Sequence, residues 1–207
     1  MVIKSIISWN VKGLGLDHKK QTIKEFIKTK KAQFIALQET HTDNSRISKT
    51  LGVTDAIWSH ANTASKGVGL LWTDESVKCM KVWKDDEGRV VIGVFKIDNE
   101  KVIIGSVYAP NIDASVRSQQ RYSRFILDLE ALLGEAKKHA QSFILCGDFN
   151  LYCDPYLDTE ESNIMPHPYP ICKDNFLDFL TNTNAADLLR TTHRRKKTLL
   201  LFPLGRE

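Results

Sequence analysis

The sequence contains few cysteines and no CxxC pair; its four cysteines are Cys79, Cys146, Cys153 and Cys172. Structural zinc sites and disulfide frameworks use cysteines at short, repeated spacings, so neither is expected here. The sequence also lacks a run of 18 apolar residues, which excludes a membrane-spanning helix on sequence grounds. The apolar stretch in MVIKSIISWN is too short for a signal peptide. We therefore expect an intracellular protein with no membrane partner.

Charge of either sign is unevenly spread along the 207 residues, of which 42% are hydrophobic and 26% charged, as in one ordinary globular domain. Residues 1–31 hold eight lysines against two acids, and residues 190–207 hold six Lys or Arg against one Glu, so the middle is net acidic. Basic ends around an acidic centre suit a polyanion ligand with a central cation. Lysines on a solvated helix face would give the same pattern.

Periodicity and turn signals predict helices that alternate with strands and a β-meander. The expected helices cover residues 18–31, 114–139 and 174–181; the expected strands cover residues 2–10, 33–38, 67–72, 77–84, 89–97, 101–108 and 142–146. Residues 40–66 are polar and turn-rich. This pattern predicts an α/β or α+β fold in which two packed sheets have helices outside them.

Polar side chains follow several of the apolar runs at the point where each predicted strand ends. They occur in the segments SWN, LQET, SVYAPN and CGDFN, and they are Asn10, Glu39, Tyr108, Asn111, Asp148 and Asn150. If these strand ends meet at one rim, two carboxylates lie among amides and a phenol. Such oxygens suit Mg²⁺ or Mn²⁺, and amide and phenol donors suit a phosphate that gains charge in a transition state.

Each of these residues also has an ordinary structural explanation when it is taken alone. Asn10 is a common turn former, Glu39 could be a surface acid, and Tyr108 could be a half-buried packing residue. Gly-Asp-Phe-Asn could be an Asx turn. The joint pattern is what points to a site.

The segments SWNVKGL, ALQETH, VYAPN and GDFN, with spacings of 29, 69 and 40 between Asn10, Glu39, Tyr108 and Asp148, resemble the endonuclease/exonuclease/phosphatase superfamily. LQETH followed by VYAPN is most similar to the endonuclease domain of LINE-1-type retrotransposons, a relative of the apurinic/apyrimidinic endonucleases. The resemblance implies a four-layer α/β sandwich, two mostly antiparallel sheets flanked by helices, that cleaves phosphodiester bonds with Mg²⁺ or Mn²⁺.

The resemblance also implies a role for each matched residue. Glu39 matches the metal-binding glutamate, with Asn10 beside it, and Tyr108 matches the tyrosine that contacts the scissile phosphate. Asp148 matches the aspartate that orients or activates the attacking water. Asn150 matches the phosphate-binding asparagine, and Asn111 is expected to touch the DNA backbone.

The family pattern continues to a Ser-Asp-His end that this sequence does not contain before Glu207. The resemblance thus implies an incomplete domain over residues 1–190, with its last strands missing, and an atypical basic and apolar tail over residues 191–207. Three functions stay open: a DNA-nicking endonuclease that primes a reverse transcriptase domain of the same element, in the nucleus and as a monomer; a catalytically dead nucleic-acid-binding relic; or an abasic-site, exodeoxyribonuclease III-like repair nuclease.

Overall fold

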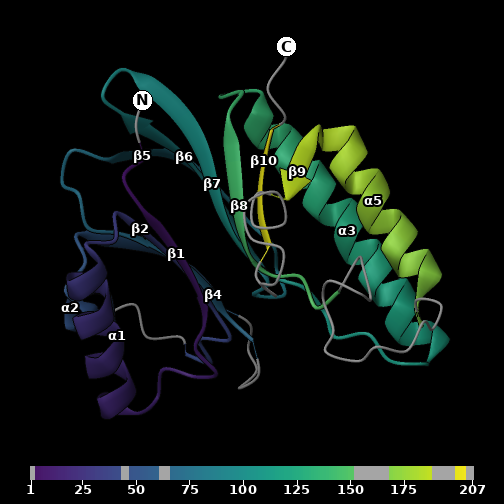
Figure 1. Ribbon diagram of the computed structural model, residues 1–207, viewed down its shortest axis with the longest axis horizontal. Helices are drawn as coiled ribbons and strands as arrows, with labels where there is room; N and C mark the ends of the chain where they lie inside the picture. The colour runs from purple at the N-terminus through teal and green to yellow at the C-terminus, as the bar shows by residue number, and fades with distance from the viewer. Residues whose placement is uncertain (1–2, 43–46, 61–65, 152–167, 188–198, 204–207) are drawn as a thin grey trace.

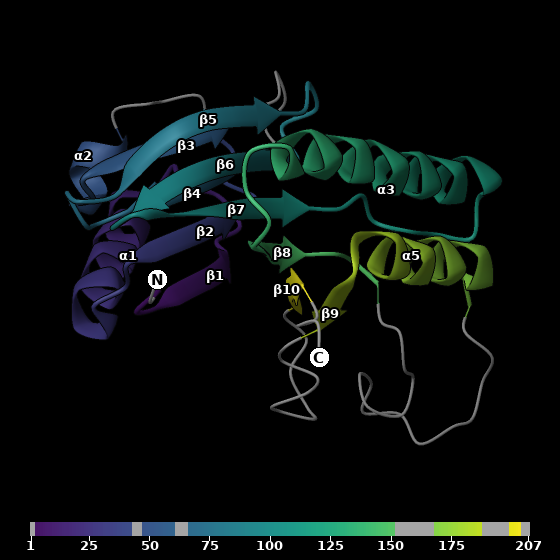
Figure 2. The same ribbon diagram turned by 90° about the horizontal axis from the view of Figure 1, so that it is seen from above.

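The computed structural model describes residues 3–42, 47–60, 66–151, 168–187 and 199–203. Its strands form two sheets that pack against each other (Figures 1 and 2). The first sheet has the order β1-β2-β4-β3, with bounds β1 Ile6–Asn10, β2 Phe34–Gln38, β3 Asp55–Ser59 and β4 Val68–Trp72. Strands β1 and β2 are parallel, and the other pairs are antiparallel.

The second sheet has the order β5-β6-β7-β8-β10-β9. Its bounds are β5 Lys78–Lys84, β6 Val90–Ile97, β7 Glu100–Tyr108, β8 Phe143–Asp148, β9 Ala185–Asp187 and β10 Leu199–Pro203. Only β7 and β8 run parallel in this sheet, and α3 connects them. A parallel pair needs such a crossover, since a tight hairpin can join only antiparallel strands.

Helices cover the outer face of each sheet, as Figure 2 shows. Helices α1 Asp17–Lys30 and α2 Ile47–Leu51 pack on the first sheet, and α3 Val116–Lys137 and α5 Pro170–Thr183 lie beside the second. In the part of the chain that the structure describes, no helix is long and apolar enough to cross a membrane.

Three apolar clusters fill the spaces between these layers. One lies between the first sheet and its helices, one between the second sheet and its helices, and one between the sheets. Strand β2 shows why: its five residues are all buried, Ile35 and Leu37 pack toward the helices, and Phe34 packs between the sheets. Successive strand residues point to opposite faces, so a strand covered on both sides is apolar throughout. The predicted α/β fold of two packed, mostly antiparallel sheets flanked by helices is confirmed, and each sheet is mixed because it contains a parallel pair.

The segment from 40 to 66 and the tail differ from the sequence expectations. The polar 40–66 segment contains α2 and β3, whose short apolar pieces, such as Ile57 and Trp58, are buried only through tertiary packing. Residues Leu199–Pro203 of the tail, which the sequence marked only as atypical, form β10, hydrogen-bonded between β8 and β9. That the last strands of the family are missing stays a prediction. A run of consecutive apolar residues is typical of a strand with neighbours on both sides.

Candidate active site

The ends of β1, β2, β7 and β8 meet at one rim of the two sheets. In the first sheet Asn10 lies opposite Gln38, so Glu39 follows directly beside it. In the second sheet Tyr108 lies opposite Asp148. Parallel pairing in both sheets brings the carboxyl ends of adjacent strands to the same edge.

Buried hydrogen bonds fix the distance between the two sheets just below this rim. The Gln38 amide donates to the Ser106 hydroxyl at 3.1 Å, and the Ser106 hydroxyl donates to the Leu37 carbonyl at 3.1 Å. Both side chains are buried polar groups whose bonding capacity would be costly to leave unmet. These cross-sheet contacts therefore hold Glu39 and Tyr108, one residue and two residues further along, in a defined relation.

One amide group holds the two carboxylates of the site together. Asn10 Nδ2 donates to Glu39 Oε1 at 2.7 Å and to Asp148 Oδ2 at 3.1 Å. The Lys12 backbone N–H donates to Asn10 Oδ1 at 3.2 Å, which fixes the orientation of the amide. Three residues separated by as many as 138 positions thus form one hydrogen-bonded cluster.

Tyr108 lies against the same cluster and is buried. Burial, followed by the negative charge of Glu39 and a hydrogen bond to it, raises the pKa of Tyr108 to about 12. The Arg89 guanidinium lies 5.3 Å from the centre of the Tyr108 ring, and Arg89 Nη1 donates to the Tyr108 carbonyl at 3.1 Å. Tyr108 is therefore a neutral hydrogen-bond donor at pH 7, and Arg89 contacts both its ring and its backbone carbonyl.

Asn150 contacts Asp148 through its backbone and the residue that follows β7 through its side chain. Its backbone N–H donates to Asp148 Oδ1 at 3.1 Å, and its Nδ2 donates to the Ala109 carbonyl at 2.7 Å. The first bond is the Asx turn that the sequence allowed as a structural explanation. The same aspartate nevertheless binds Asn10 with its other oxygen, so the turn and the cluster coexist.

Left-handed backbone conformations occur at several positions around the rim. Glu39 has φ 52°, His41 has φ 50° and Asn150 has φ 49°. Positive φ is uncommon for residues other than glycine and costs energy, so it persists where the surroundings impose it. At Glu39 the backbone is fixed by its neighbours: its carbonyl accepts from the Gly13 N–H, and the Thr40 N–H donates to the Gly67 carbonyl at 3.0 Å.

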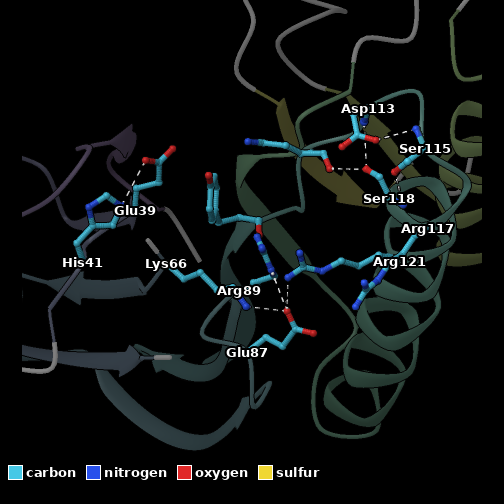
Figure 3. Close-up of a pocket in the computed structure, with 12 residues that line it drawn as sticks. Glu39, His41, Lys66, Glu87, Arg89, Asp113, Ser115, Arg117, Ser118 and Arg121 are labelled. Atoms are coloured by element: carbon cyan, nitrogen blue, oxygen red, sulfur yellow. Dashed lines mark hydrogen bonds and ion pairs between the residues drawn. The ribbon is translucent and has the colours of Figure 1, made fainter. Parts of the chain in front are cut away.

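A cavity of about 820 Å³ opens beside the cluster (Figure 3). Glu39, Tyr108 and Asn111 line it, so the structure brings Asn111 into the same space as two of the other predicted residues. The backbone carbonyl of Asn111 accepts from Ser118 at 3.2 Å, which ties the end of the VYAPN segment to the start of α3. The geometry therefore brings all six predicted residues to one rim, and their roles stay predictions.

Sequence reasoning missed several charged residues of the same cavity. His41 Nε2 lies 3.4 Å from Glu39 Oε2. The other charged residues missed in the cavity lining include Lys66, Glu87, Arg89, Arg117 and Arg121. His41 belongs to the quoted motif ALQETH and could have been singled out. The others come from a turn, a loop and a helix face, where charged residues are common, so no local pattern marks them.

The oxygen atoms of this site suit a metal ion that takes only some of its ligands from the protein. Among the described residues, no group of three or more His, Cys, Asp and Glu side chains is placed to hold a metal ion. Glu39 and Asp148 supply two carboxylates, and both accept a hydrogen bond from the Asn10 amide. Glu39 also lines the cavity. Mg²⁺ is commonly bound by one or two carboxylates while water and substrate phosphate complete its shell, and these residues fit that requirement.

Comparisons with known proteins agree with this geometry. The chain is 26% identical over 158 residues to an exodeoxyribonuclease of Bacillus subtilis, a match that covers 70% of this chain and 58% of that protein. The fold is similar to an AP endonuclease of Leishmania major, LMAP, with TM-score 0.77, 18% identity, and coverage of 96% of this chain and 78% of that one. It is also similar to a 3′ phosphatase, NExo, from Neisseria bound to product DNA hairpin, with TM-score 0.70, 17% identity, and coverage of 95% and 86%.

The chain spans less than two thirds of the length of the exodeoxyribonuclease that it matches. At these low identities, the two structural similarities establish the fold. The sequence profile of a broader family covers most of the chain, residues 7–195, including the four strand ends that form the cluster. The chain belongs to the Endonuclease/Exonuclease/phosphatase family.

Proposed function

We propose that this chain is a divalent-metal-dependent phosphodiesterase that cleaves DNA, and that it is the nicking endonuclease of a retroelement. One observation carries the proposal: the Asn10 amide contacts both Glu39 and Asp148 at the mouth of a cavity that Tyr108 also lines. Paired carboxylates can hold a metal ion that polarises a phosphoryl oxygen, and neutral donors beside them can stabilise charge that develops on the phosphate. The family is one of nucleases and phosphatases, and members generally depend on a divalent metal.

Each residue has a task that follows from its position. Glu39, with Asn10 beside it, would hold Mg²⁺ or Mn²⁺, which would polarise a phosphoryl oxygen and stabilise the leaving oxygen. Asp148 would orient a water molecule and accept its proton. Tyr108, neutral at pH 7, would donate a hydrogen bond to a nonbridging phosphate oxygen.

Asn150 would also donate to the phosphate, but in this structure its side-chain amide already donates to a backbone carbonyl. Its Nδ2 donates to the Ala109 carbonyl at 2.7 Å, and its position depends on the turn at Asp148. A phosphate oxygen at the end of β7 would share or replace this acceptor. The proposal therefore assigns Asn150 two tasks, holding the loop after β8 and binding phosphate when substrate is present.

The retroelement assignment is supported by the motifs LQETH and VYAPN and by their order along the chain. In this role the chain would act as a monomer in the nucleus and leave a 3′-hydroxyl for a reverse transcriptase domain of the same element. A nucleic acid substrate is supported by the neighbours, since one is an AP endonuclease and another was solved with product DNA.

A plasmid-nicking assay tests the proposal. Supercoiled plasmid is incubated with the purified chain in Mg²⁺ or in EDTA, and conversion to open circles is followed on gels. We expect nicking in Mg²⁺ only, and its loss in Glu39→Gln and Asp148→Asn. Glu135→Gln is the matched control, because Glu135 pairs with Lys138 on the exposed face of α3.

Three outcomes would count against the proposal. Nicking that persists in both site variants would place the chemistry elsewhere. Salt-sensitive DNA binding without any cleavage would support the nucleic-acid-binding relic. Cleavage confined to plasmid that carries abasic sites would support the repair nuclease.

A further inference from the structure

The cavity beside the carboxylate cluster has two ends of opposite charge. Glu39 and His41 lie at one end of it, and four cationic side chains extend from the middle of the cavity to its other end (Figure 3). We call these four the basic wall: Lys66 before β4, Arg89 before β6, and Arg117 and Arg121 on α3. Residues 117 and 121 are four apart on one helix, so both side chains project from the same face.

A single carboxylate oxygen gathers three of these cations. Glu87 Oε2 accepts from Arg121 Nη2 at 2.8 Å, from Lys66 Nζ at 2.9 Å and from Arg89 Nε at 3.3 Å. These hydrogen bonds and ion pairs lower the pKa of Glu87 to about 2. An anionic oxygen surrounded by three cationic donors is the environment that protein sites offer to a phosphate oxygen.

The wall retains positive charge after these contacts. Its four cations face two carboxylates, Glu87 and Asp113, and Asp113 is engaged by the Ser115 backbone N–H at 2.8 Å. Within the described ranges no ion-pair partner is recorded for Arg117, which is exposed and lines the cavity. The family chemistry at the carboxylates does not use this surplus, because it lies across the cavity from Glu39.

We propose that the basic wall is a second phosphate-binding subsite, which holds a neighbouring phosphate of the strand whose scissile phosphate lies at Tyr108. The inference rests on the proposed function and deepens it: the substrate is a polynucleotide, because a compound with one phosphate would leave the wall empty. Cavities that hold drug-sized ligands are about 300–1,000 Å³, so a volume of about 820 Å³ accommodates more than one phosphate group. Arg89 contacts both groups of residues, since it forms an ion pair with Glu87 and packs on the Tyr108 ring.

Binding of a fluorescent single-stranded octanucleotide, measured by anisotropy in EDTA at several salt concentrations, tests the subsite without requiring cleavage. We compare the wild-type chain with Arg117→Gln and Arg121→Gln. Arg124→Gln is the control, because Arg124 is on the same helix but pairs with Asp128 and does not line this cavity. Each lost phosphate contact should raise Kd about tenfold and reduce the slope of log K against log salt by about 0.7.

The outcomes separate this inference from the proposed function. The expected losses in the two wall variants, with an unchanged Arg124→Gln, support the subsite even if the wild-type chain never nicks a plasmid. Equal losses in all three variants, or none in the wall variants, would overturn it. Because Arg121→Gln removes an ion pair, thermal unfolding of each variant is compared first. If Arg121→Gln unfolds, the binding of Arg117→Gln, which breaks no described ion pair, tests the subsite.

Discussion

Replacing Asn10 with alanine should destabilise the protein, because the amide that donates to both carboxylates would no longer offset their mutual repulsion. The Glu39 and Asp148 oxygens that share its amide lie no more than about 6 Å apart, since each is within hydrogen-bond distance of the same nitrogen. At an effective dielectric constant of about 20, two unit charges at about 6 Å repel by roughly 3 kcal/mol. Solvent at the cavity mouth reduces this, so we expect a loss of about 1–3 kcal/mol in the free energy of unfolding.

Thermal unfolding followed by circular dichroism in EDTA measures this loss. For a chain of this length about 1 kcal/mol lowers Tm by about 2–4 °C, so Asn10→Ala should lower it by about 2–12 °C. Asn182→Ala is the control, because Asn182 is exposed and its amide makes one long contact of 3.4 Å to Glu130. Excess Mg²⁺ should restore more stability to Asn10→Ala than it adds to the control. If the two variants unfold alike in EDTA, the amide does not hold the carboxylates.

Three further predictions concern Tyr108, Glu87 and Gly147. Tyr108→Phe should slow cleavage about 10²-fold, and because the pKa of Tyr108 is about 12, the wild-type rate should show no ionisation of this phenol between pH 6 and 10. Glu87→Gln should cost about 1 kcal/mol at pH 7 in chemical denaturation, a value discounted because the Glu87 side chain is 54% exposed. Because the folded pKa of Glu87, about 2, lies below the usual glutamate pKa of 4.5, this stabilisation is present above pH 4.5 and should vanish as pH falls through 2. Gly147→Ala should lower the free energy of unfolding by about 3 kcal/mol, since a Cβ would collide with the Val107 backbone, whereas Gly134→Ala, with no atom near, should not destabilise α3.

The long elements could be predicted because each has a strong pattern of its own. Strand β7 is apolar over most of its length and follows a turn, and α3 repeats apolar residues at helical spacing, with Tyr122, Ile126, Leu129 and Leu133 buried as expected. Strand β3 has no such pattern, because it is short and its first residue, Asp55, is exposed. It forms a strand through its pairing with β4. Similarly α5 begins at Pro170, earlier than its apolar residues suggest, since proline is well suited to the first turn of a helix.

The carboxylate end of the site could be predicted for a geometric reason. A polar residue directly after a buried strand is placed by the strand itself. Parallel pairing in the first sheet sets Asn10 beside Glu39, and the packing of the two sheets brings Asp148 to them. The basic wall is not placed in this way. Glu87 lies in the turn between β5 and β6, and Arg121 lies on a helix, so their contact at 2.8 Å depends on how α3 packs on the second sheet.

The negative side chains of the site follow strand ends, and the positive side chains come from loops and a helix, and this difference suits their proposed ligands. Carboxylates at strand ends are fixed by backbone hydrogen bonds and keep their spacing, which a small divalent cation requires. Long cationic side chains on a turn and a helix have adaptable ends, which suits the phosphates of a strand whose sequence is not read. Arg89 connects the two, since it is buried, binds the Glu87 carboxylate and supports the Tyr108 ring. If the proposed function and the second subsite hold, Arg89 would lie among the side chains that bind the neighbouring phosphate and would contact the tyrosine that binds the scissile one.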